Sequence, residues 1–516
     1  MELIFWCFDK WITITVNRGE LVKRNLRKLA SKGLDVLEDN QVNEVAAFLS
    51  KQEKLLKPMN VHNEIGWDYL EGQLVYKHHK IIHKKSTETI ESKYSGVYHL
   101  EPQGDPYDFF NLFLKEVRGY VPLELMLCIG ISPLVIGMLN RSKEGSFDSL
   151  LVHIVGPSTT GKTTAAMFGA ALVGSPKVDE GLLQTYNGTK NAMASKLAGN
   201  HGALMVLDES TMNLMDTQSL SSFIYELAQN SEKSRLSKDS ELKNSKTWST
   251  TILSTGESSI LKKANNNEGL RVRLFEFSID KWTQSAESAD KLKRGLHHNY
   301  GHVVPKVAEK MLEIGPEEIF NMVESNKEYI KELLPDSRFR ARVAMKFSVL
   351  ITAIDLFEIT FNLKLSREEI LDMLIEQEHQ SMDERDMAPK FYVQLKQYIT
   401  RYRKNFKLPN QDVNNHQEIW GKIEVSENET RCYILPVIFK NIVKELGFSD
   451  TEVLISELKK MGVTQYEKAK NKKRKFIFTK EESKQREKVL GNPNYARNGD
   501  YTYCIKYDGD IFKDSF

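Results

Sequence analysis

Three runs in the middle of the chain, each ending in polar residues, predict strands of one sheet. Two of them, Leu150–Val155 and Ala203–Leu207, are apolar, and the third, Trp248–Glu257, mixes apolar residues with serines and threonines. Continuous apolar strands that are separated by helical segments are typical of α/β folds, in which helices cover both faces of a parallel sheet. We therefore predict an α/β core in this part of the chain.

Helical spacing dominates the segments around this core. Residues 105–145 are apolar and helical, and residues 285–404 predict a helical lid. The predicted helices of the lid are Pro305–Leu312, Pro316–Leu334, Phe339–Leu363 and Arg367–Tyr402. Before residue 104, a helical stretch at Arg18–Leu49 and several short strand-like pieces predict a small α+β accessory domain.

The C-terminal part begins after Lys407–Asn415, whose Pro and Asn residues predict a linker. Two short helices, Pro436–Leu446 and Thr451–Met461, lie on either side of a tight turn that contains glycine. Strand-like runs follow at Val463–Tyr466 and Lys475–Phe478. A helix pair across such a turn, followed by two strands, predicts a winged-helix domain.

The loop between these two strand-like runs is basic. Its cationic residues are Lys468, Lys470, Lys472, Lys473 and Arg474. Such a cluster suits contacts with DNA phosphates and makes binding salt-dependent. Basic runs are often only solvated loops, but the adjoining helix pair favours duplex DNA as the partner of this domain.

The composition indicates the cellular compartment more clearly than it indicates a binding partner. The formal net charge is only +2, so a nucleic-acid surface has to be local. The four cysteines lie far apart and form no C-x-x-C pair, which disfavours a zinc site and favours a reducing, cytoplasmic location. The first residues do not resemble a signal peptide.

One apolar stretch, Val121–Leu139, is about long enough to span a bilayer. It contains Glu124 and Pro133, which fit a membrane span poorly. We favour a buried helix pair beside the α/β core, and we expect no membrane association.

The first apolar run leads directly into the phosphate-binding pattern G-x-x-x-x-G-K-T. With the threonine that follows, the residues are Gly156, Pro157, Ser158, Thr159, Thr160, Gly161, Lys162, Thr163 and Thr164. A strand before the loop and a helix after it give the motif the context that it requires. Backbone N–H groups would hold phosphates, Lys162 would reach the β- and γ-phosphates, and Thr163 would bind Mg²⁺. The expected cofactors are ATP and Mg²⁺.

The second and third runs end in residues that suit nucleotide hydrolysis. Asp208 and Glu209 follow the second run. We predict that Asp208 binds Mg²⁺, directly or through water, and that Glu209 is the general base for the attacking water. Ser254 and Thr255 lie near the end of the third run. Thr255 is expected to sense the γ-phosphate or to position the water, unless these hydroxyls only complete a strand-end turn.

Two arginines, Arg271 and Arg273, fall on a strand-like run at Gly269–Phe277. Strand alternation would point both side chains to the same side. One explanation is a surface salt bridge. The other is an arginine finger, which stabilises the charge that develops on the γ-phosphate.

A basic, histidine-bearing patch surrounds His78, His79 and His83. No cysteine or carboxylate falls at ligand spacing from these residues, so we favour a solvated turn over a metal site.

Together these motifs resemble the replicative helicases of staphylococcal mobile islands, the Cch and Rep proteins of chromosome cassettes and pathogenicity islands. Those proteins form an MCM-like branch of the AAA+ ATPases. The similar stretches are Gly156–Thr163, Leu204–Glu209, Trp248–Glu257, Gly269–Arg273 and His297–Gly301. The resemblance implies a homo-oligomeric, hexameric ring that uses ATP to translocate on DNA and to unwind duplex at a replication origin.

By the same resemblance, Arg273 would act in trans on the nucleotide of a neighbouring subunit. The polar segment Lys233–Lys243 would be a hairpin that projects into the ring channel and grips the phosphates of a single strand. Its basic residues are Lys233, Arg235, Lys238 and Lys243. Lys238 is the expected tip. No segment resembles a primase active site.

The predicted organisation has four parts. Residues 1–104 form the accessory domain, 105–404 an AAA+ ATPase with leading helices and lid, 405–416 a linker, and 417–516 a winged-helix-like DNA-binding domain. Two other functions compete with that of a helicase. One is an ATP-dependent, origin-binding initiator or loader switch without processive unwinding, which would keep the same ATPase site. The other is a nucleotide-gated scaffold with a degenerate site, against which the intact Lys162, Asp208 and Glu209 argue.

Overall fold

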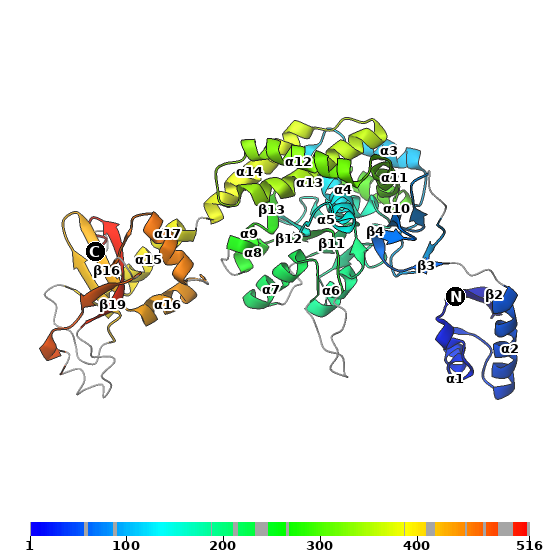
Figure 1. Cartoon of the computed structure of the whole chain (residues 1–516), viewed down its shortest axis with the longest axis horizontal. Helices are drawn as coiled ribbons and strands as arrows, with labels where there is room; N and C mark the ends of the chain where they lie inside the picture. The colour runs from blue at the N-terminus through cyan, green and yellow to red at the C-terminus, as the bar shows by residue number, and fades with distance from the viewer. Residues whose placement is uncertain are drawn as a thin grey trace. The chain divides into compact units, whose positions relative to one another are not determined.

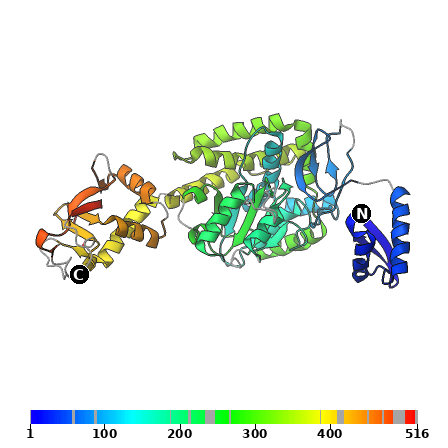
Figure 2. The same ribbon diagram turned by 60° about the horizontal axis from the view of Figure 1, so that its bottom comes forward.

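Figures 1 and 2 show the protein as a computed structural model. The structure describes residues 2–55, 60–85, 90–186, 188–209, 215–232, 246–264, 268–385, 387–408, 418–448, 451–467, 471–482, 484 and 499–512. Contacts divide the chain into two compact units, Met1–Val61 with Glu91–Lys93, and His62–Ile90 with Tyr94–Phe516.

The three predicted runs form strands of one five-stranded parallel sheet. β8 (Leu150–Val155) lies between β13 (Leu274–Ser278) and β12 (Thr251–Gly256). β11 (Met205–Asp208) and β9 (Leu183–Thr185) complete the order β13-β8-β12-β11-β9. Every neighbouring pair is parallel, so the carboxyl ends of β8, β11 and β12 meet at one edge of the sheet. The predicted α/β class is confirmed.

The apolar stretch before this sheet is one buried helix, α4 (Val121–Ser142). Among the described residues, α4 alone is long and apolar enough to cross a membrane, and 89% of its most apolar window is buried inside the protein. The prediction of a helix pair is wrong, because Pro133 does not end the helix. Pro133 cannot donate to the Ile129 carbonyl, and the hydroxyl of Ser132 donates to that carbonyl instead, at 2.9 Å.

Short strands before α4 join the unit that contains the parallel sheet. β4 (Ile65–Leu70), β5 (Gln73–Lys77) and β6 (Ile81–Ile82) form a sheet with β10 (Asn200–His201), in the order β10-β4-β5-β6. We predicted these strands as part of the accessory domain. They pack here instead because Trp67 is buried against α4, where its Nε1 donates to the Leu134 carbonyl at 2.8 Å.

The predicted solvated turn at His78 is wrong. The side chain of His78 is fully buried. Its Nε2 lies 2.8 Å from the Val173 carbonyl oxygen, and its Nδ1 lies 2.8 Å from Nδ1 of His79. Burial lowers the pKa of His78 to about 3, so the imidazole is neutral at physiological pH.

The other described elements of this unit are mostly helices. They are β3 (Val61–His62), β7 (Lys93–Tyr94), α3 (Pro106–Glu116), α5 (Lys162–Ala171), α6 (Lys190–Leu197), α7 (Thr217–Ala228), α8 (Ile260–Lys263), α9 (Glu268–Arg271), α10 (Ala286–His298), α11 (Val304–Ile314), α12 (Pro316–Leu333), α13 (Arg340–Phe361) and α14 (Arg367–Arg385). The predicted helical region is therefore present, and α13 packs against both α12 and α4.

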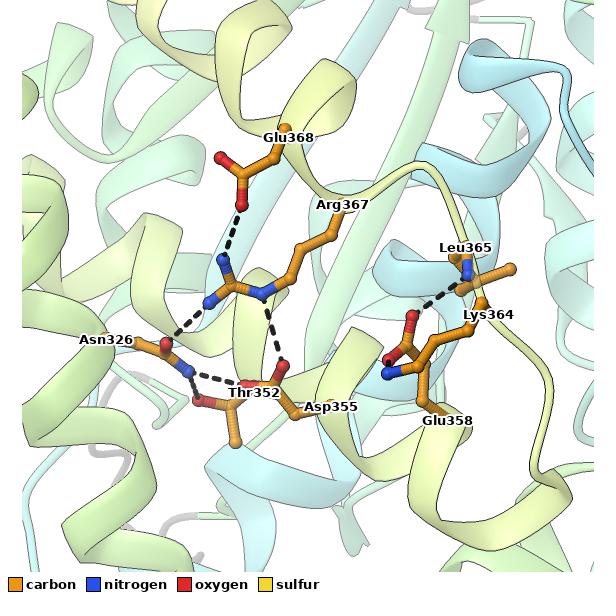
Figure 3. Close-up of polar contacts among 8 residues, drawn as sticks. All are labelled: Asn326, Thr352, Asp355, Glu358, Lys364, Leu365, Arg367 and Glu368. Carbon is orange, nitrogen blue, oxygen red and sulfur yellow. Dashed lines mark hydrogen bonds and ion pairs between the residues drawn. The ribbon is translucent and has the colours of Figure 1, made fainter.

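A polar network holds α12, α13 and α14 together (Figure 3). Asn326 Nδ2 donates to Thr352 Oγ1 at 3.1 Å and to Asp355 Oδ2 at 2.8 Å. Arg367 Nη2 donates to Asn326 Oδ1 at 2.9 Å, and its Nε donates to Asp355 Oδ1 at 3.3 Å. Because each of these polar side chains forms hydrogen bonds with side chains of another helix, the network fixes the relative positions of the three helices.

The C-terminal part is a six-stranded sheet with helices. Its described elements are α15 (Met387–Arg401), β14 (Phe406–Lys407), β15 (Gly421–Val425), β16 (Glu429–Ile434), α16 (Pro436–Glu445), α17 (Thr451–Lys460), β17 (Thr464–Gln465), β18 (Lys473–Phe476) and β19 (Gly499–Asp508). The predicted helix pair is present as α16 and α17. We predicted α15 as the end of the lid, but its buried Phe391, Leu395 and Ile399 belong to this C-terminal core.

The strands on either side of the basic loop do not form a hairpin with each other. β17 and β18 each pair antiparallel with β19. Between the two strands, the Glu467 N–H donates to the Lys472 carbonyl at 3.2 Å. The long strand β19, which lies far along the chain, therefore decides the topology of this sheet.

The N-terminal unit consists of a β-hairpin followed by helices. Its elements are β1 (Glu2–Cys7), β2 (Lys10–Thr15), α1 (Lys23–Leu26) and α2 (Asp39–Leu55), with 3-10 turns at Arg18–Glu20 and Arg27–Lys32. The predicted helix at Arg18–Leu49 is thus divided into short pieces. It is interrupted at Gly33, where φ is +95°.

Candidate nucleotide-binding site

The phosphate-binding sequence forms the loop between β8 and α5. Gly161 has φ +88° and is the N-cap of α5. A Cβ at this position would lie 2.5 Å from Thr283 Oγ1, so the close approach of the segment after β13 requires glycine here. The Trp282 N–H also donates to the Thr160 carbonyl at 2.8 Å, which holds the loop from outside.

Lys162 begins α5 and lies inside the loop. Its Nζ donates to the carbonyl oxygens of Gly156 at 2.9 Å and of Pro157 at 2.7 Å. Burial lowers the pKa of the Lys162 ammonium, while Glu257 and Asp208 oppose that shift. The cation is therefore held at the centre of the loop, where an anion would be bound.

Asp208 ends β11 beside the start of α5. Its carboxylate is buried, at 5% exposure. Asp208 Oδ1 accepts a hydrogen bond from Thr163 Oγ1 at 3.5 Å and another from Thr255 Oγ1. A carboxylate and a hydroxyl at this spacing form the oxygen donor set that Mg²⁺ prefers, so these residues fit the predicted metal.

Glu209 turns out of the sheet directly after Asp208. It has φ +60°, a left-handed conformation that is uncommon for a residue with a side chain. Its N–H donates to Thr255 Oγ1 at 3.0 Å. Thr255 therefore binds both acidic residues, since it donates to Asp208 and accepts from the backbone of Glu209. Strain that is held in place by neighbouring groups is typical of functional sites.

These residues line one cleft of about 340 Å³. Its lining consists of Ser158, Thr159, Gly161, Lys162, Thr163, Thr164, Glu209, Thr255, Gly256, Glu257 and Lys293. Three of them, Gly256, Glu257 and Lys293, were absent from the predicted site. Glu257 accepts a hydrogen bond from Ser158 Oγ and follows the Ser254-Thr255 pair closely, a signal that the sequence did carry. Lys293 comes from α10, and no local pattern in the sequence pointed to it.

Arg273 lies outside this cleft. The prediction that Arg271 and Arg273 lie on a strand is wrong, because α9 ends at Arg271 and β13 begins at Leu274. Leu274 pairs with Leu151, near the start of β8, whereas the phosphate loop follows the end of β8. Arg273 is thus at the amino-terminal edge of the sheet, roughly 15–20 Å from the loop along the strands. It cannot reach the nucleotide site of its own chain.

The predicted DNA-binding residues are described only in part. Lys233, Arg235, Lys238 and Lys243, together with Lys468 and Lys470, lie outside the described residues. The residues that flank the segment 233–245 are antiparallel, with a bridge between Ser231 and Thr247 and a hydrogen bond from the Glu232 N–H to the Lys246 carbonyl at 2.9 Å.

The other predicted DNA-binding residues border or lie on β18. Lys472 precedes β18, Lys473 and Arg474 are its first two residues, and Arg474 is exposed. Lys473 and Arg474 therefore lie on a strand that pairs with β19.

Comparison with known proteins places these features in context. A family described as a domain of unknown function, DUF927, matches residues 9–247. The Cch helix turn helix domain matches residues 386–510. No curated protein matches the chain.

A solved structure described as "SCCmec type IV Cch - active helicase" is similar, with a TM-score of 0.77 and 23% sequence identity. The match covers 99% of this chain and 91% of that chain. The predicted resemblance to the Cch type is confirmed. The chain has the fold of that helicase over nearly its whole length, and its C-terminal region is similar to the Cch helix turn helix domain.

Proposed function

We propose that this chain is an ATP-dependent DNA helicase that supports replication of a mobile genetic element. The observation that carries the proposal is the convergence of Lys162, Glu209 and Thr255 on one cleft, with Asp208 hydrogen-bonded to Thr255 beside it, in a chain that has the fold of a protein described as an active helicase. DNA as the substrate and four free cysteines are consistent with the cytoplasm.

The residues of this site have different roles in ATP hydrolysis. The loop N–H groups at the start of α5 and the Lys162 ammonium bind and orient the phosphates of ATP. Thr163 and Asp208 would hold Mg²⁺, which when bound neutralises charge on the phosphates. Glu209 accepts a proton from the attacking water. Thr255 holds Glu209 by its N–H and Asp208 by its carboxylate, so both acids keep their positions without reorganising.

Arg273 would complete the site of a neighbouring subunit. Its place at the opposite edge of the sheet excludes action on its own nucleotide, and an arginine supplied in trans stabilises the charge that builds on the transferred phosphoryl group. We therefore propose a homo-oligomer with nucleotide sites between subunits. A closed ring of six subunits is the form that the resemblance to the Cch and Rep helicases implies.

Two regions would contact DNA. The segment 233–245, whose flanking residues are antiparallel, is proposed as the hairpin that grips a single strand in the channel through Lys233, Arg235, Lys238 and Lys243. The helix turn helix domain is proposed to bind duplex, with contributions from Lys468, Lys470, Lys472, Lys473 and Arg474.

The proposed ATPase chemistry is tested by comparing two carboxylates of the same cleft. Glu209→Gln should still bind ATP and should lose at least about 100-fold in kcat, because general-base catalysis contributes on that order. Glu257→Gln is the matched control and should retain most of the hydrolysis rate. Lys162→Ala should lose nucleotide binding. A Glu209→Gln protein that hydrolyses ATP as fast as wild type would rule out the assignment.

A further inference from the structure

Arg273 is held by an aromatic ring and a carbonyl group. Its Cζ lies 4.9 Å from the centroid of the Tyr225 ring, and its Nη1 donates to the Gly269 carbonyl at 2.8 Å. Within the described ranges, no carboxylate pairs with Arg273, and its buried Nε has no hydrogen-bond partner. The salt-bridge explanation of Arg273 therefore finds no support in the part of the chain that the structure describes.

A ring suits an arginine that has to act on a phosphate. A carboxylate partner would neutralise the guanidinium and would compete with the phosphate for its N–H donors. The face of an aromatic ring attracts the cation and orients its plane, but does not accept hydrogen bonds from the donors at the edge of the guanidinium. Tyr225 therefore holds Arg273 in place and does not block it.

Tyr225 is itself on a fixed support. It lies near the end of α7, which contacts both α9 and β8. Trp248 Nε1 donates to the Leu227 carbonyl at 2.9 Å. Asn230, just after α7, accepts from the Ser149 N–H at 2.8 Å and donates to the Phe147 carbonyl at 2.7 Å. These bonds tie the end of α7 to the chain before β8, so the ring keeps its place.

We propose that Tyr225 is a positioning residue, whose ring orients Arg273 toward the ATP that is bound by a neighbouring subunit. The inference rests on the proposed function, since it needs Arg273 to act in trans. It adds to the proposed hydrolysis site a residue, Tyr225, that touches neither the nucleotide nor the cleft of its own chain.

The experiment mixes two inactive chains. Arg273→Ala keeps its own cleft but provides no finger, and Lys162→Ala provides a finger but has no working cleft. An equal mixture of the two should regain ATP hydrolysis, because the intact clefts meet intact arginines. Tyr225→Leu is then added either to the Lys162→Ala chain or to the Arg273→Ala chain.

The expected result depends on which chain carries the change. Tyr225→Leu in the finger-providing Lys162→Ala chain should lower hydrolysis by about tenfold, which corresponds to the energy of a partly desolvated cation–π contact. The same change in the Arg273→Ala chain should leave hydrolysis near that of the parent mixture, which also shows that the variant folds. Tyr225→Phe in the finger-providing chain should keep the rate, since the ring remains.

Two results would overturn the proposal, and they are distinguishable. If Tyr225→Leu has the same effect in both chains, or no effect in either, the ring has only a packing role. If the parent mixture regains no hydrolysis, Arg273 does not act in trans, so the proposed shared site fails and this inference fails with it.

Discussion

Replacing Thr255 with valine tests how the cleft holds its two acids. The change keeps the shape of the side chain and removes one hydroxyl. That hydroxyl donates to the buried carboxylate of Asp208 and accepts from the Glu209 N–H at 3.0 Å. A hydrogen bond to a charged group contributes about 1.5–3 kcal/mol. If most of this energy orients the acids for hydrolysis, kcat falls by about 10- to 100-fold.

The assay is steady-state phosphate release at saturating ATP and Mg²⁺, together with direct measurement of nucleotide binding. Thr255→Val should lower kcat and change the affinity for ATP little, because Lys162 and the loop remain. Thr255→Ser should restore most of the rate, since it returns the hydroxyl.

The adjacent hydroxyl provides the control. Ser254 lies on the other side of β12, where its Oγ accepts from the Tyr186 hydroxyl at 2.9 Å and lies 3.0 Å from His153 Nδ1. Ser254→Ala should lower the stability of the protein and leave kcat unchanged. The reasoning is refuted if Thr255→Val hydrolyses ATP at the wild-type rate, or if Ser254→Ala lowers kcat as much.

Three other predictions concern His78, Lys293 and the basic residues of β18. Because the pKa of His78 falls from 6.5 to about 3 on folding, the unfolded state binds more protons than the folded state between these pH values, and the free energy of unfolding should be lower by about 2 kcal/mol at pH 5. His78→Gln should therefore show a smaller decrease in Tm between pH 7.5 and pH 5 than the wild type. An equal decrease would contradict the assignment. Lys293→Ala should raise KM for ATP more than it lowers kcat, since Lys293 lines the cleft from α10 and no catalytic role is assigned to it; steady-state kinetics would refute this if only kcat changed. Lys473→Ala with Arg474→Ala should weaken duplex binding and reduce the slope of log affinity against log salt by about one for each DNA phosphate that the variant no longer neutralises, and an unaltered slope in a salt titration would remove both residues from the interface.

The sequence allowed prediction of those parts of the site whose geometry is local. The loop before Lys162 needs glycine at Gly161, and the acidic pair Asp208-Glu209 continues directly from a buried strand. In both places neighbouring residues along the chain fix the backbone. The contact of Thr255 with both acids follows from the position of β12 between β8 and β11. The sequence predicted that Thr255 lies near the site, but not that it binds both acids.

Other features depend on partners that lie far along the chain. Apolar and polar residues alternate around Arg273, as they do in a strand. The side chains of Leu270, Val272 and Leu274 are nevertheless buried in the structure, where a helical turn precedes the strand. β17 and β18 join their sheet by pairing with β19, and β4 pairs with the two-residue strand β10, which lies far along the chain. Local patterning cannot specify such pairings, because they are made by residues that the pattern does not contain.

The measurement that tests the central claim most directly is ATP-dependent displacement of a labelled strand from a forked duplex. The account predicts that the wild-type protein unwinds the fork, that Lys162→Ala neither hydrolyses ATP nor unwinds, and that Lys238→Ala hydrolyses ATP without unwinding. The contradictory result is a wild-type protein that hydrolyses ATP but displaces no strand from forked, 3′-tailed or 5′-tailed substrates. The helicase proposal would then fall, and an ATP-dependent initiator or loader switch would replace it.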